Sequence, residues 1–373
     1  MKRIGVGIIG WGFMGKTHTH ALREMPLFYP GAGFEPVLAS VCSRRVDMAK
    51  EAARQMGFAH FTDDYMETLR RDDVQVVSIC TPNELHEEMA LRAIELGKHV
   101  YLDKPVSTDY ASAKRIADAA KKAVVTCQVA LNNRFLPAII RAKQLIDEGR
   151  IGEVTAFRCY YKHSGSIDPN RPVGWKQLSS AGVLQDLGSH ALDMITWLIG
   201  APESLMCSLR TLYPARPKAG GGEVTALGDD HALIVMKMPG GAVGTVEASK
   251  IWTGADDELG FDIAGTKGAI RFDLMQPNYV EFFDNAVPEA AYGGERGYVR
   301  IAAVARFEKP AGAFLPPKNT IGWDRAHMHC YYSFLQSIAD GTKPSPNLDD
   351  GAEVQRLMDL CTKSHNEARW LQA

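Results

Sequence analysis

The sequence predicts an α/β protein, in which an N-terminal doubly wound parallel sheet precedes an α+β domain with a large, open, mainly antiparallel sheet. Over residues 1–130, short apolar runs alternate with helix-compatible segments, and a glycine-rich turn follows the first run. From residue 151 onward, alternating strand-like runs are separated by glycine-rich turns instead. A chain of 373 residues exceeds one ordinary core. We therefore expect two domains, over residues 1–130 and 131–373.

The composition excludes several classes of protein. Apolar residues make up 46% of the chain, charged residues 23%, and the net charge is −2, which gives no reason to expect nucleic acid or a membrane surface as partner. No apolar run approaches the length of a membrane span, and the N-terminus is strand-like and not a signal peptide. The seven scattered cysteines contain no C-x-x-C pair, which predicts reduced thiols in a cytoplasmic protein.

The first apolar run, Lys2 to Ile9, flows into Gly10-Trp11-Gly12-Phe13-Met14-Gly15 and then into a helix-compatible stretch. G-x-G-x-x-G between a strand and a helix is typical of a dinucleotide-binding Rossmann domain. The first glycine permits the tight turn, the second lets the backbone approach a pyrophosphate, and the third packs helix against strand. The helix N-terminus adds free N–H groups and the positive end of its dipole. This stretch predicts a dinucleotide site.

The second strand indicates which dinucleotide binds. After an expected loop over Pro26–Pro36, the strand from Pro36 ends in Ser43-Arg44-Arg45, where a carboxylate would normally hold the adenosine ribose. A hydroxyl beside guanidinium groups attracts a 2′-phosphate, so the sequence favours NADP over NAD. The alternative is that both arginines are solvated charges at the start of the next helix, with NAD held by other contacts.

The alternation continues through three further strands and two helices, and polar residues follow two of these strands. The strands are expected at 74–80, 98–102 and 123–130, and the helices at about 84–96 and 109–122. Thr81-Pro82-Asn83 and Asp103-Lys104-Pro105 stand at carboxyl ends of strands, where ligands bind in doubly wound sheets. Both tripeptides are therefore expected at the site.

The second domain is expected to begin after a helix over residues 137–148. Strand-like runs occupy residues 153–162, 231–238, 244–251, 261–264 and 269–272, with one clear helix among them. Residues 280–322 are poorly patterned, and two helical segments near 326–340 and 350–370 close the chain.

That one helix carries an unusual set of ionisable residues. Asp186, His190 and Asp193 stand at i, i+4 and i+7, within roughly 40° on one face of an α-helix. The remaining positions are mostly apolar, and buried ionisable groups are costly unless paired. The set therefore predicts a functional cluster. The alternative is a structural network in which two carboxylates fix the histidine. A metal site is disfavoured, because further ligands at recognisable spacing are lacking.

Taken together, these motifs resemble the glucose–fructose oxidoreductase/inositol dehydrogenase (Gfo/Idh/MocA) family over essentially the whole chain. Five elements match in order: Gly10–Gly15, Thr81-Pro82-Asn83 with His86, Asp103-Lys104-Pro105, Asn133-Arg134-Phe135 with Pro137, and the Asp186/His190/Asp193 helix. The family's Glu-Lys-Pro is Asp-Lys-Pro here, which shortens the acid and keeps the lysine. The resemblance implies that the antiparallel sheet forms a homodimer or homotetramer.

The resemblance also implies roles for individual residues. Lys104 would be the lysine beside the nicotinamide, His190 the acid/base on the substrate hydroxyl, and Asp186 the partner that orients both. Residues expected to contact the cofactor are Gly10, Trp11, Gly12, Phe13, Met14, Gly15, Ser43, Arg44, Arg45, Cys80, Thr81, Pro82, Asn83, His86, Asp103, Lys104 and Arg134. Residues expected to contact substrate are Lys104, Arg134, Tyr161, His163, Trp175, Lys176, Asp186, His190 and Asp193.

The expected activity is oxidation of a secondary ring hydroxyl of a sugar, glycoside or cyclitol to a ketone, or the reverse reduction, with NADP or NAD. Histidine titrates near neutral pH, and a lysine supplies positive charge where an alkoxide develops. Two alternatives stay open: a glycosidase that uses tightly held NAD for transient oxidation, and a non-catalytic sugar sensor. His327 and His329 with Cys330 are not expected to bind metal, and His18 and His20 are expected to flank the cofactor turn without chemical roles.

Overall fold

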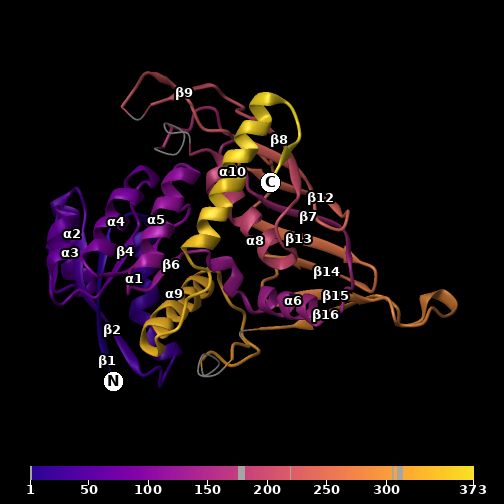
Figure 1. Ribbon diagram of the computed structural model, residues 1–373, viewed down its shortest axis with the longest axis horizontal. Coiled ribbons are helices and arrows are strands. Elements are labelled where there is room, and N and C mark those ends of the chain that lie inside the picture. The colour runs from indigo at the N-terminus through magenta and orange to yellow at the C-terminus, as the bar shows by residue number, and fades with distance from the viewer. Residues whose placement is uncertain (1, 175–180, 219, 305, 309–313) are drawn as a thin grey trace. The chain divides into compact units, whose positions relative to one another are not determined.

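The computed structural model describes residues 2–174, 181–218, 220–304, 306–308 and 314–373. The chain divides into two compact units (Figure 1): Met1–Leu136 with Ala305–Gln355, and Pro137–Val304 with Arg356–Ala373. Within the described part of the chain, no helix combines the length and the apolar character needed to cross a membrane.

The first unit is built on a six-stranded parallel sheet with the order β3-β2-β1-β4-β5-β6. Its strands are β1 (Lys2–Ile9), β2 (Phe34–Cys42), β3 (His60–Thr62), β4 (Val76–Ile79), β5 (His99–Leu102) and β6 (Cys127–Val129). The strand order reverses between β1 and β4, and such a switch point is where doubly wound sheets bind ligands. The predicted doubly wound parallel sheet is confirmed.

The helices of this unit are α1 (Phe13–Phe28), α2 (Val46–Met56), α3 (Tyr65–Arg70), α4 (His86–Glu95), α5 (Tyr110–Lys122) and α9 (Trp323–Asp340). Helix α1 packs against α9, and α4 packs against α3 and α5. Two starts are capped by side chains: Asp64 accepts from the Met66 amide, and Asp109 accepts from the Ser112 amide. The unit also contains the 3₁₀ turns η1 (Asn83–Leu85) and η2 (Asn132–Phe135).

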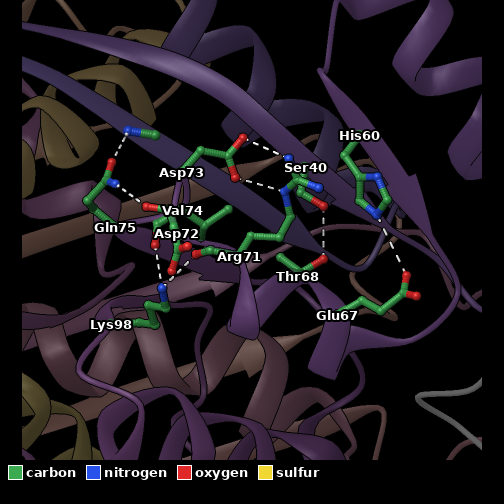
Figure 2. Close-up of polar contacts among 11 residues, drawn as sticks. Ser40, His60, Glu67, Thr68, Arg71, Asp72, Asp73, Val74, Gln75 and Lys98 are labelled. Carbon is green, nitrogen blue, oxygen red and sulfur yellow. Dashed lines mark hydrogen bonds and ion pairs between the residues drawn. The ribbon is translucent and has the colours of Figure 1, made fainter.

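Polar contacts hold the segment that leads into β4 (Figure 2). Gln75 accepts a hydrogen bond from the Gly5 amide at 2.7 Å, and Lys98 Nζ donates to the carbonyl oxygens of Arg71 (2.9 Å) and Val74 (2.7 Å). A Cβ on Gly5 would lie 1.7 Å from the Asp73 carbonyl oxygen, so only glycine fits there. The Gln75 contact and the close approach at Gly5 hold β1 against the start of β4, and the opposite ends of these two strands carry predicted cofactor motifs.

The second unit is built on a nine-stranded sheet with the order β16-β15-β14-β13-β7-β12-β11-β8-β17. Strand β12 pairs with β7 in parallel, and the other pairings are antiparallel. The predicted large, mainly antiparallel sheet is therefore confirmed. Its strands are β7 (Val154–Lys162), β8 (Ser204–Arg210), β11 (His231–Lys237), β12 (Val243–Ser249), β13 (Glu258–Gly265), β14 (Gly268–Asp273), β15 (Tyr279–Asp284), β16 (Tyr298–Ala302) and β17 (Leu371–Gln372).

Two helices of this unit contact the sheet. Helix α6 (Pro137–Asp147) packs on β14 and β15, and α8 (Ser189–Ile199) packs on β7 and β12. A single π turn, Leu184–Gly188, leads directly into α8. The short strands β9 (Ala215–Pro217) and β10 (Glu223–Thr225) form a separate pair, and η4 (Ala291–Gly293) is a 3₁₀ turn. Helix α10 (Leu348–Glu367) belongs to the first unit up to Gln355 and to the second from Arg356.

One expectation about local structure is wrong. The segment 26–36 is not a loop throughout: α1 continues through Pro26 to Phe28, and β2 begins at Phe34. Met25 and Tyr29 are buried at the last turn of α1, and the Tyr29 ring stacks on the Tyr332 ring with centroids 3.8 Å apart. This packing outweighs the free-energy cost of Pro26 inside the helix.

The unpatterned segment 280–322 contains most of β15 and all of β16, although residues 305 and 309–313 of it lie outside the described residues. Strand β16 escapes detection because four of its five residues are exposed, so its sequence lacks an apolar alternation.

Candidate active site

Each glycine of the turn after β1 has its own reason to lack a side chain. Gly10 has a φ of +102°, and a Cβ there would lie 2.6 Å from the Cys80 carbonyl oxygen. A Cβ on Gly15 would lie 2.1 Å from the Gly10 carbonyl oxygen. A Cβ on Gly12 would meet nothing within 4 Å, so this face of the turn is open for a ligand to approach the bare backbone.

The start of α1 suits an anion. Gly12 is its N-cap without a side-chain hydrogen bond, and the first turn contains no acidic residue. The N–H groups of this turn therefore keep their hydrogen-bonding capacity and the positive end of the helix dipole. The open backbone and the uncapped helix fit the pyrophosphate of a dinucleotide. Two aromatic rings of the turn pack against other rings. The largely exposed Phe13 stacks on Trp323, and Trp11 lies edge-on to Phe58.

The corner after β2 holds the three residues that the sequence predicts to contact the ribose, Ser43, Arg44 and Arg45. The Ser43 amide donates to the Thr62 carbonyl oxygen at 3.1 Å, which fixes this residue beside β3. Arg44 and Arg45 are exposed, and Arg45 is the N-cap of α2. Two guanidinium side chains therefore stand at the end of β2, with the Ser43 hydroxyl beside them.

His86 connects the two predicted motifs at the ends of β4 and β5. Its ring is fully buried, with Nδ1 3.0 Å from the Pro105 carbonyl oxygen and Nε2 2.9 Å from the Thr81 carbonyl oxygen. Burial lowers the pKa of His86, and the Asp103 carboxylate opposes this shift. Both ring nitrogens face carbonyl groups, so His86 links the loops that follow β4 and β5.

The residues around Lys104 are also held locally. Asp103 is buried, and its Oδ1 accepts a hydrogen bond from the Lys104 amide at 2.9 Å. The turn after β6 places Arg134, which is 6% exposed, 3.5 Å from the Asp350 carboxylate of α10. The other predicted cofactor residues lie at the turn and the strand ends as follows: half-buried Met14, Cys80, Thr81 and Pro82, and buried Asn83.

In the second unit, Asp229 fixes the start of the π turn. Its carbonyl oxygen accepts from the Val183 amide at 2.8 Å, and its Oδ2 accepts from the Leu184 amide at 2.9 Å. A Cβ on Gly182 would lie 2.1 Å from Oδ1 of this aspartate, so the close approach requires glycine. Burial raises the pKa of the Asp229 carboxyl, and the bond from Leu184 opposes this shift. Asp229 is absent from the predicted set.

The π turn changes how the acid–histidine–acid set is built. Asp186 lies within the π turn, whereas His190 and Asp193 lie in α8. The α-helical spacing therefore describes His190 and Asp193, and Asp186 is placed by a wider turn. π turns of this kind occur frequently at functional sites. His190 and Asp193 are buried, with exposures of 8% and 2%.

Lys250, which sequence reasoning missed, contacts this set directly. Its Nζ lies 2.7 Å from Asp186 Oδ2, and the two side chains are 10% and 13% exposed. The residue follows β12 at the end of a mostly buried run. A lysine closing such a run was the available signal, because a charge at a buried position needs a partner.

Two predicted lining residues lie in the same cluster. The Tyr161 ring is 5.7 Å from the His190 ring, and its hydroxyl donates to Asp257 Oδ2 at 3.2 Å. Burial, Asp257 and Asp186 raise the pKa of Tyr161 well above its usual value. For His163, burial and Lys250 lower the pKa, while Asp257 and Asp186 oppose the shift. Trp175 and Lys176 lie outside the described residues.

One histidine outside this cluster, His329, is held by packing. In α9, Nδ1 of His329 lies 2.9 Å from the Tyr29 hydroxyl, and burial together with Arg325 lowers its pKa to about 3. Over the ranges that the structure describes, no group of three or more His, Cys, Asp or Glu side chains is arranged to hold a metal ion.

The fold and these two groups of residues define a class of protein, a two-domain dinucleotide-dependent oxidoreductase. Residues 4–131 match the oxidoreductase family's NAD-binding Rossmann fold, and residues 143–373 match its C-terminal alpha/beta domain. The chain therefore belongs to the Gfo/Idh/MocA oxidoreductase family, which confirms the predicted resemblance.

Several relatives of this chain are dehydrogenases. Levoglucosan dehydrogenase from Pseudarthrobacter phenanthrenivorans is 33% identical, over 100% of this chain and 98% of the relative. The scyllo-inositol 2-dehydrogenase (NAD(+)) from Bacillus subtilis is 26% identical, over 74% of this chain and 76% of the relative. A solved structure of levoglucosan dehydrogenase in complex with NADH and levoglucosan superposes with a TM-score of 0.94 at 32% identity, covering 100% of this chain and 99% of that one.

Proposed function

We propose that this chain is an NAD(P)-dependent dehydrogenase that oxidises a secondary ring hydroxyl of a sugar, glycoside or cyclitol to a ketone, or runs the reverse reduction. The observation that carries the proposal is the cluster of buried His190 and Lys250 with the nearly buried Asp186, in a chain with an NAD-binding domain. Buried ionisable groups gathered in this way are typical of sites that move protons. The substrates named for the relatives, levoglucosan and inositols, support a compact polyhydroxylated ring.

The residues of the proposed site have two tasks, to accept the proton of the substrate hydroxyl and to stabilise the charge that develops on its oxygen. A bound nicotinamide would supply the acceptor for the hydride of the alcohol carbon. His190 takes the proton of the same hydroxyl, so that the C–O bond becomes a carbonyl. Asp186 orients His190 and the hydroxyl, and the Lys104 ammonium stabilises the developing alkoxide. Arg134, Tyr161, His163, Asp193 and the undescribed Trp175 and Lys176 complete the proposed substrate contacts.

The first test measures turnover with a panel of sugars, anhydrosugars and cyclitols by following the absorbance of the reduced cofactor. We expect His190→Ala and Lys104→Ala each to lower kcat/KM by about 10²–10⁴-fold, the usual loss when a proton-transfer group is removed. Circular dichroism and cofactor titration control for folding and cofactor binding. Full turnover in both variants would show the assignment to be wrong, and glycosidic cleavage without net reduced cofactor would indicate a glycosidase.

The cofactor itself is a separate proposal. We propose NADP as the preferred cofactor, because Arg44 and Arg45 are exposed beside Ser43 and offer guanidinium groups to a 2′-phosphate. The NADH complexes of levoglucosan dehydrogenase favour NAD for that relative. The residues at this corner therefore have to be tested in this chain.

Calorimetric titration with NADP and NAD decides between them. We expect Arg44→Ala to weaken NADP binding about tenfold, as the loss of one charge-assisted hydrogen bond would. NAD binding is expected to stay within about twofold of the wild type. Arg54→Ala, an exposed arginine near the end of the same α2 helix, is the matched control. Preferred binding of NAD, unchanged in Arg44→Ala, contradicts the proposal.

The assembly and the compartment also belong to this proposal. All seven cysteines are free thiols, and six of them are buried, which supports a reducing, cytoplasmic environment. The family resemblance supports a homodimer or homotetramer formed through the nine-stranded sheet.

A further inference from the structure

Lys250 is held in place along its whole length. It follows β12 directly, its amide donates to the Asp230 carbonyl oxygen at 2.9 Å, and its carbonyl oxygen accepts from the Ser166 amide at 2.7 Å. Its side chain is 10% exposed and ends 2.7 Å from Asp186 Oδ2. With its backbone fixed on two neighbouring segments, the ammonium has a defined position relative to the π turn.

Asp186 is located from the other side by the π turn. Asp229 fixes the start of this turn through the amides of Val183 and Leu184. Near its end, a Cβ on Gly188 would lie 3.7 Å from the Ala248 side chain of β12, so turn and strand are closely packed. The backbone of Asp186 is therefore set by the turn, and its carboxylate is set by Lys250.

Stability alone does not explain a nearly buried lysine at this position. Removing two charges from water costs free energy that their attraction often fails to return, and well-packed apolar residues do as well or better. Burial together with a specific charge partner is instead typical of functional sites. The cluster around the pair contains Tyr161, His163 and His190. It also contains a second carboxylate, that of Asp257.

The second carboxylate has a different kind of partner. Asp257 accepts from the Tyr161 hydroxyl, a neutral donor, whereas Asp186 is paired with an ammonium. A carboxylate with an ammonium 2.7 Å from one oxygen is charge-balanced and is held at that oxygen. Such a group is suited to orienting a neighbour and poorly suited to accepting the proton itself.

We propose that Lys250 is a positioning residue of the reaction, which balances the charge of Asp186 and fixes its carboxylate so that His190 alone accepts the substrate proton. This role rests on the proposed function. Lys250 acts through Asp186, so the two residues should behave as one unit. Removing Lys250 should misplace the orienting carboxylate, and removing Asp186 should delete it. Neither change should affect cofactor binding.

The test is a double-mutant cycle on the holoenzyme with Lys250→Met, Asp186→Asn and the double variant. We expect each single substitution to lower kcat by at least about tenfold with KM changed by less than about threefold, since the lost interaction acts on the chemical step. The double variant should be no slower than Asp186→Asn alone, because Lys250 has no role left once the carboxylate is gone. Lys250→Arg should retain more activity than Lys250→Met, because it keeps the charge.

Two further measurements separate this role from a purely structural one. Lys250→Met leaves a carboxylate without its ammonium in a nearly buried site, so this variant should melt at lower temperature, and adding Asp186→Asn should recover part of the loss. Lys162→Met is the matched control. Lys162 lies on the same sheet and pairs with Glu258 at 3.3 Å. It follows Tyr161 in β7, so its side chain points to the opposite face of the sheet. The Lys162→Met variant should therefore have the kcat of the wild type.

The outcomes are distinguishable. If the wild type oxidises a polyol and Lys250→Met keeps its kcat, or if the two substitutions reduce kcat independently, the positioning role is wrong and the dehydrogenase assignment stands. If the wild type oxidises no member of the substrate panel although it binds the cofactor, the proposed function fails, and the role of Lys250 fails with it.

Discussion

His18 lies in the first turns of α1, with its ring 1% exposed. Its Nδ1 is 2.8 Å from the Ser78 hydroxyl and 3.1 Å from the Cys80 sulfur, and its ring packs edge-on against Tyr101 and Tyr331. Burial lowers the pKa of His18 to about 4, against an opposing effect of Asp103. The residue therefore joins the helix after the glycine turn to the strand end beside it, as a neutral ring.

This burial predicts a loss of stability in mild acid. The pKa of His18 in the folded chain lies below the ordinary value of 6.5. Between these two pKa values the unfolded chain binds a proton at His18 and the folded chain does not. The contribution is fully present above about pH 6.5 and is lost as the pH falls toward about 4, which amounts to about 2 kcal/mol between pH 7 and pH 5. Urea unfolding at these two pH values measures the difference.

The matched comparison is His18→Gln against His20→Gln. The first removes the titrating ring, so its loss of stability between pH 7 and pH 5 should be smaller than that of the wild type by about 2 kcal/mol. His20 lies exposed on the same helix, and its substitution should leave the difference unchanged. Equal pH dependence in His18→Gln and wild type would contradict the expected role of the buried ring.

Individual residues were predictable where the constraint is local. Gly10, Gly12 and Gly15 follow one another in a strand–turn–helix context, and the close contacts at Gly10 and Gly15 and the open face at Gly12 agree with the reasons inferred for each. The lysine that closes the buried run of β12 signals only that Lys250 needs a partner. That this partner is Asp186, and that Asp229 fixes the π turn, was not predictable, because each contact joins distant parts of the chain. The significance of both residues depends on a tertiary contact that no local pattern records.

At the scale of elements, hydrophobic periodicity predicted those strands that bury one face or both. Strand β11 alternates buried with exposed or half-buried residues, and β4, at the centre of the first sheet, is buried throughout. The edge strand β16 has no buried residue to mark it. The π turn was also beyond prediction, because an inserted turn shifts the helical phase without altering the apolar composition.

Local signals also failed where packing decides the outcome. Pro26 normally ends a helix, yet α1 continues past it because Met25 and Tyr29 are buried on the same turn. The stacked rings of Tyr29 and Tyr332 come from α1's end and from α9, at opposite ends of the chain. A proline rule applied to the first thirty residues cannot include a partner supplied by the C-terminal region.

For the whole molecule, the fold class and the family followed from the order of motifs, whereas the path of the chain did not. Residues 305–355 return to the first unit, and residues 356–373 end in the second, where β17 pairs with β8. The sequence predicts helices near 326–340 and 350–370, and helical periodicity does not say which unit a helix joins. That choice depends on complementary surfaces, which only the three-dimensional structure defines.

The assembly is the remaining property of the whole molecule. Helices α6 and α8 contact the nine-stranded sheet, whose strand β11 alternates buried Ala232, Ile234 and Met236 with Leu233, Val235 and Lys237 on the other side. Leu233 is 40% exposed in the single chain. Since adjacent residues of a strand point to opposite faces, Leu233 marks the face that the predicted homo-oligomer would cover.

We therefore expect the protein to form a dimer or tetramer in solution, and Leu233→Arg to shift it toward the monomer, because a guanidinium buried without a partner opposes association. Light scattering coupled to size-exclusion chromatography measures the mass directly. Leu227→Arg is the matched control, since Leu227 is 65% exposed and lies outside the strands of this sheet. A monomeric wild type at tens of micromolar, or an assembly that Leu233→Arg leaves intact, would rule out this face as the interface. If the face is confirmed, Leu233→Arg also provides a monomer in which the kinetics of the Lys250 variants can be measured without contributions from neighbouring subunits.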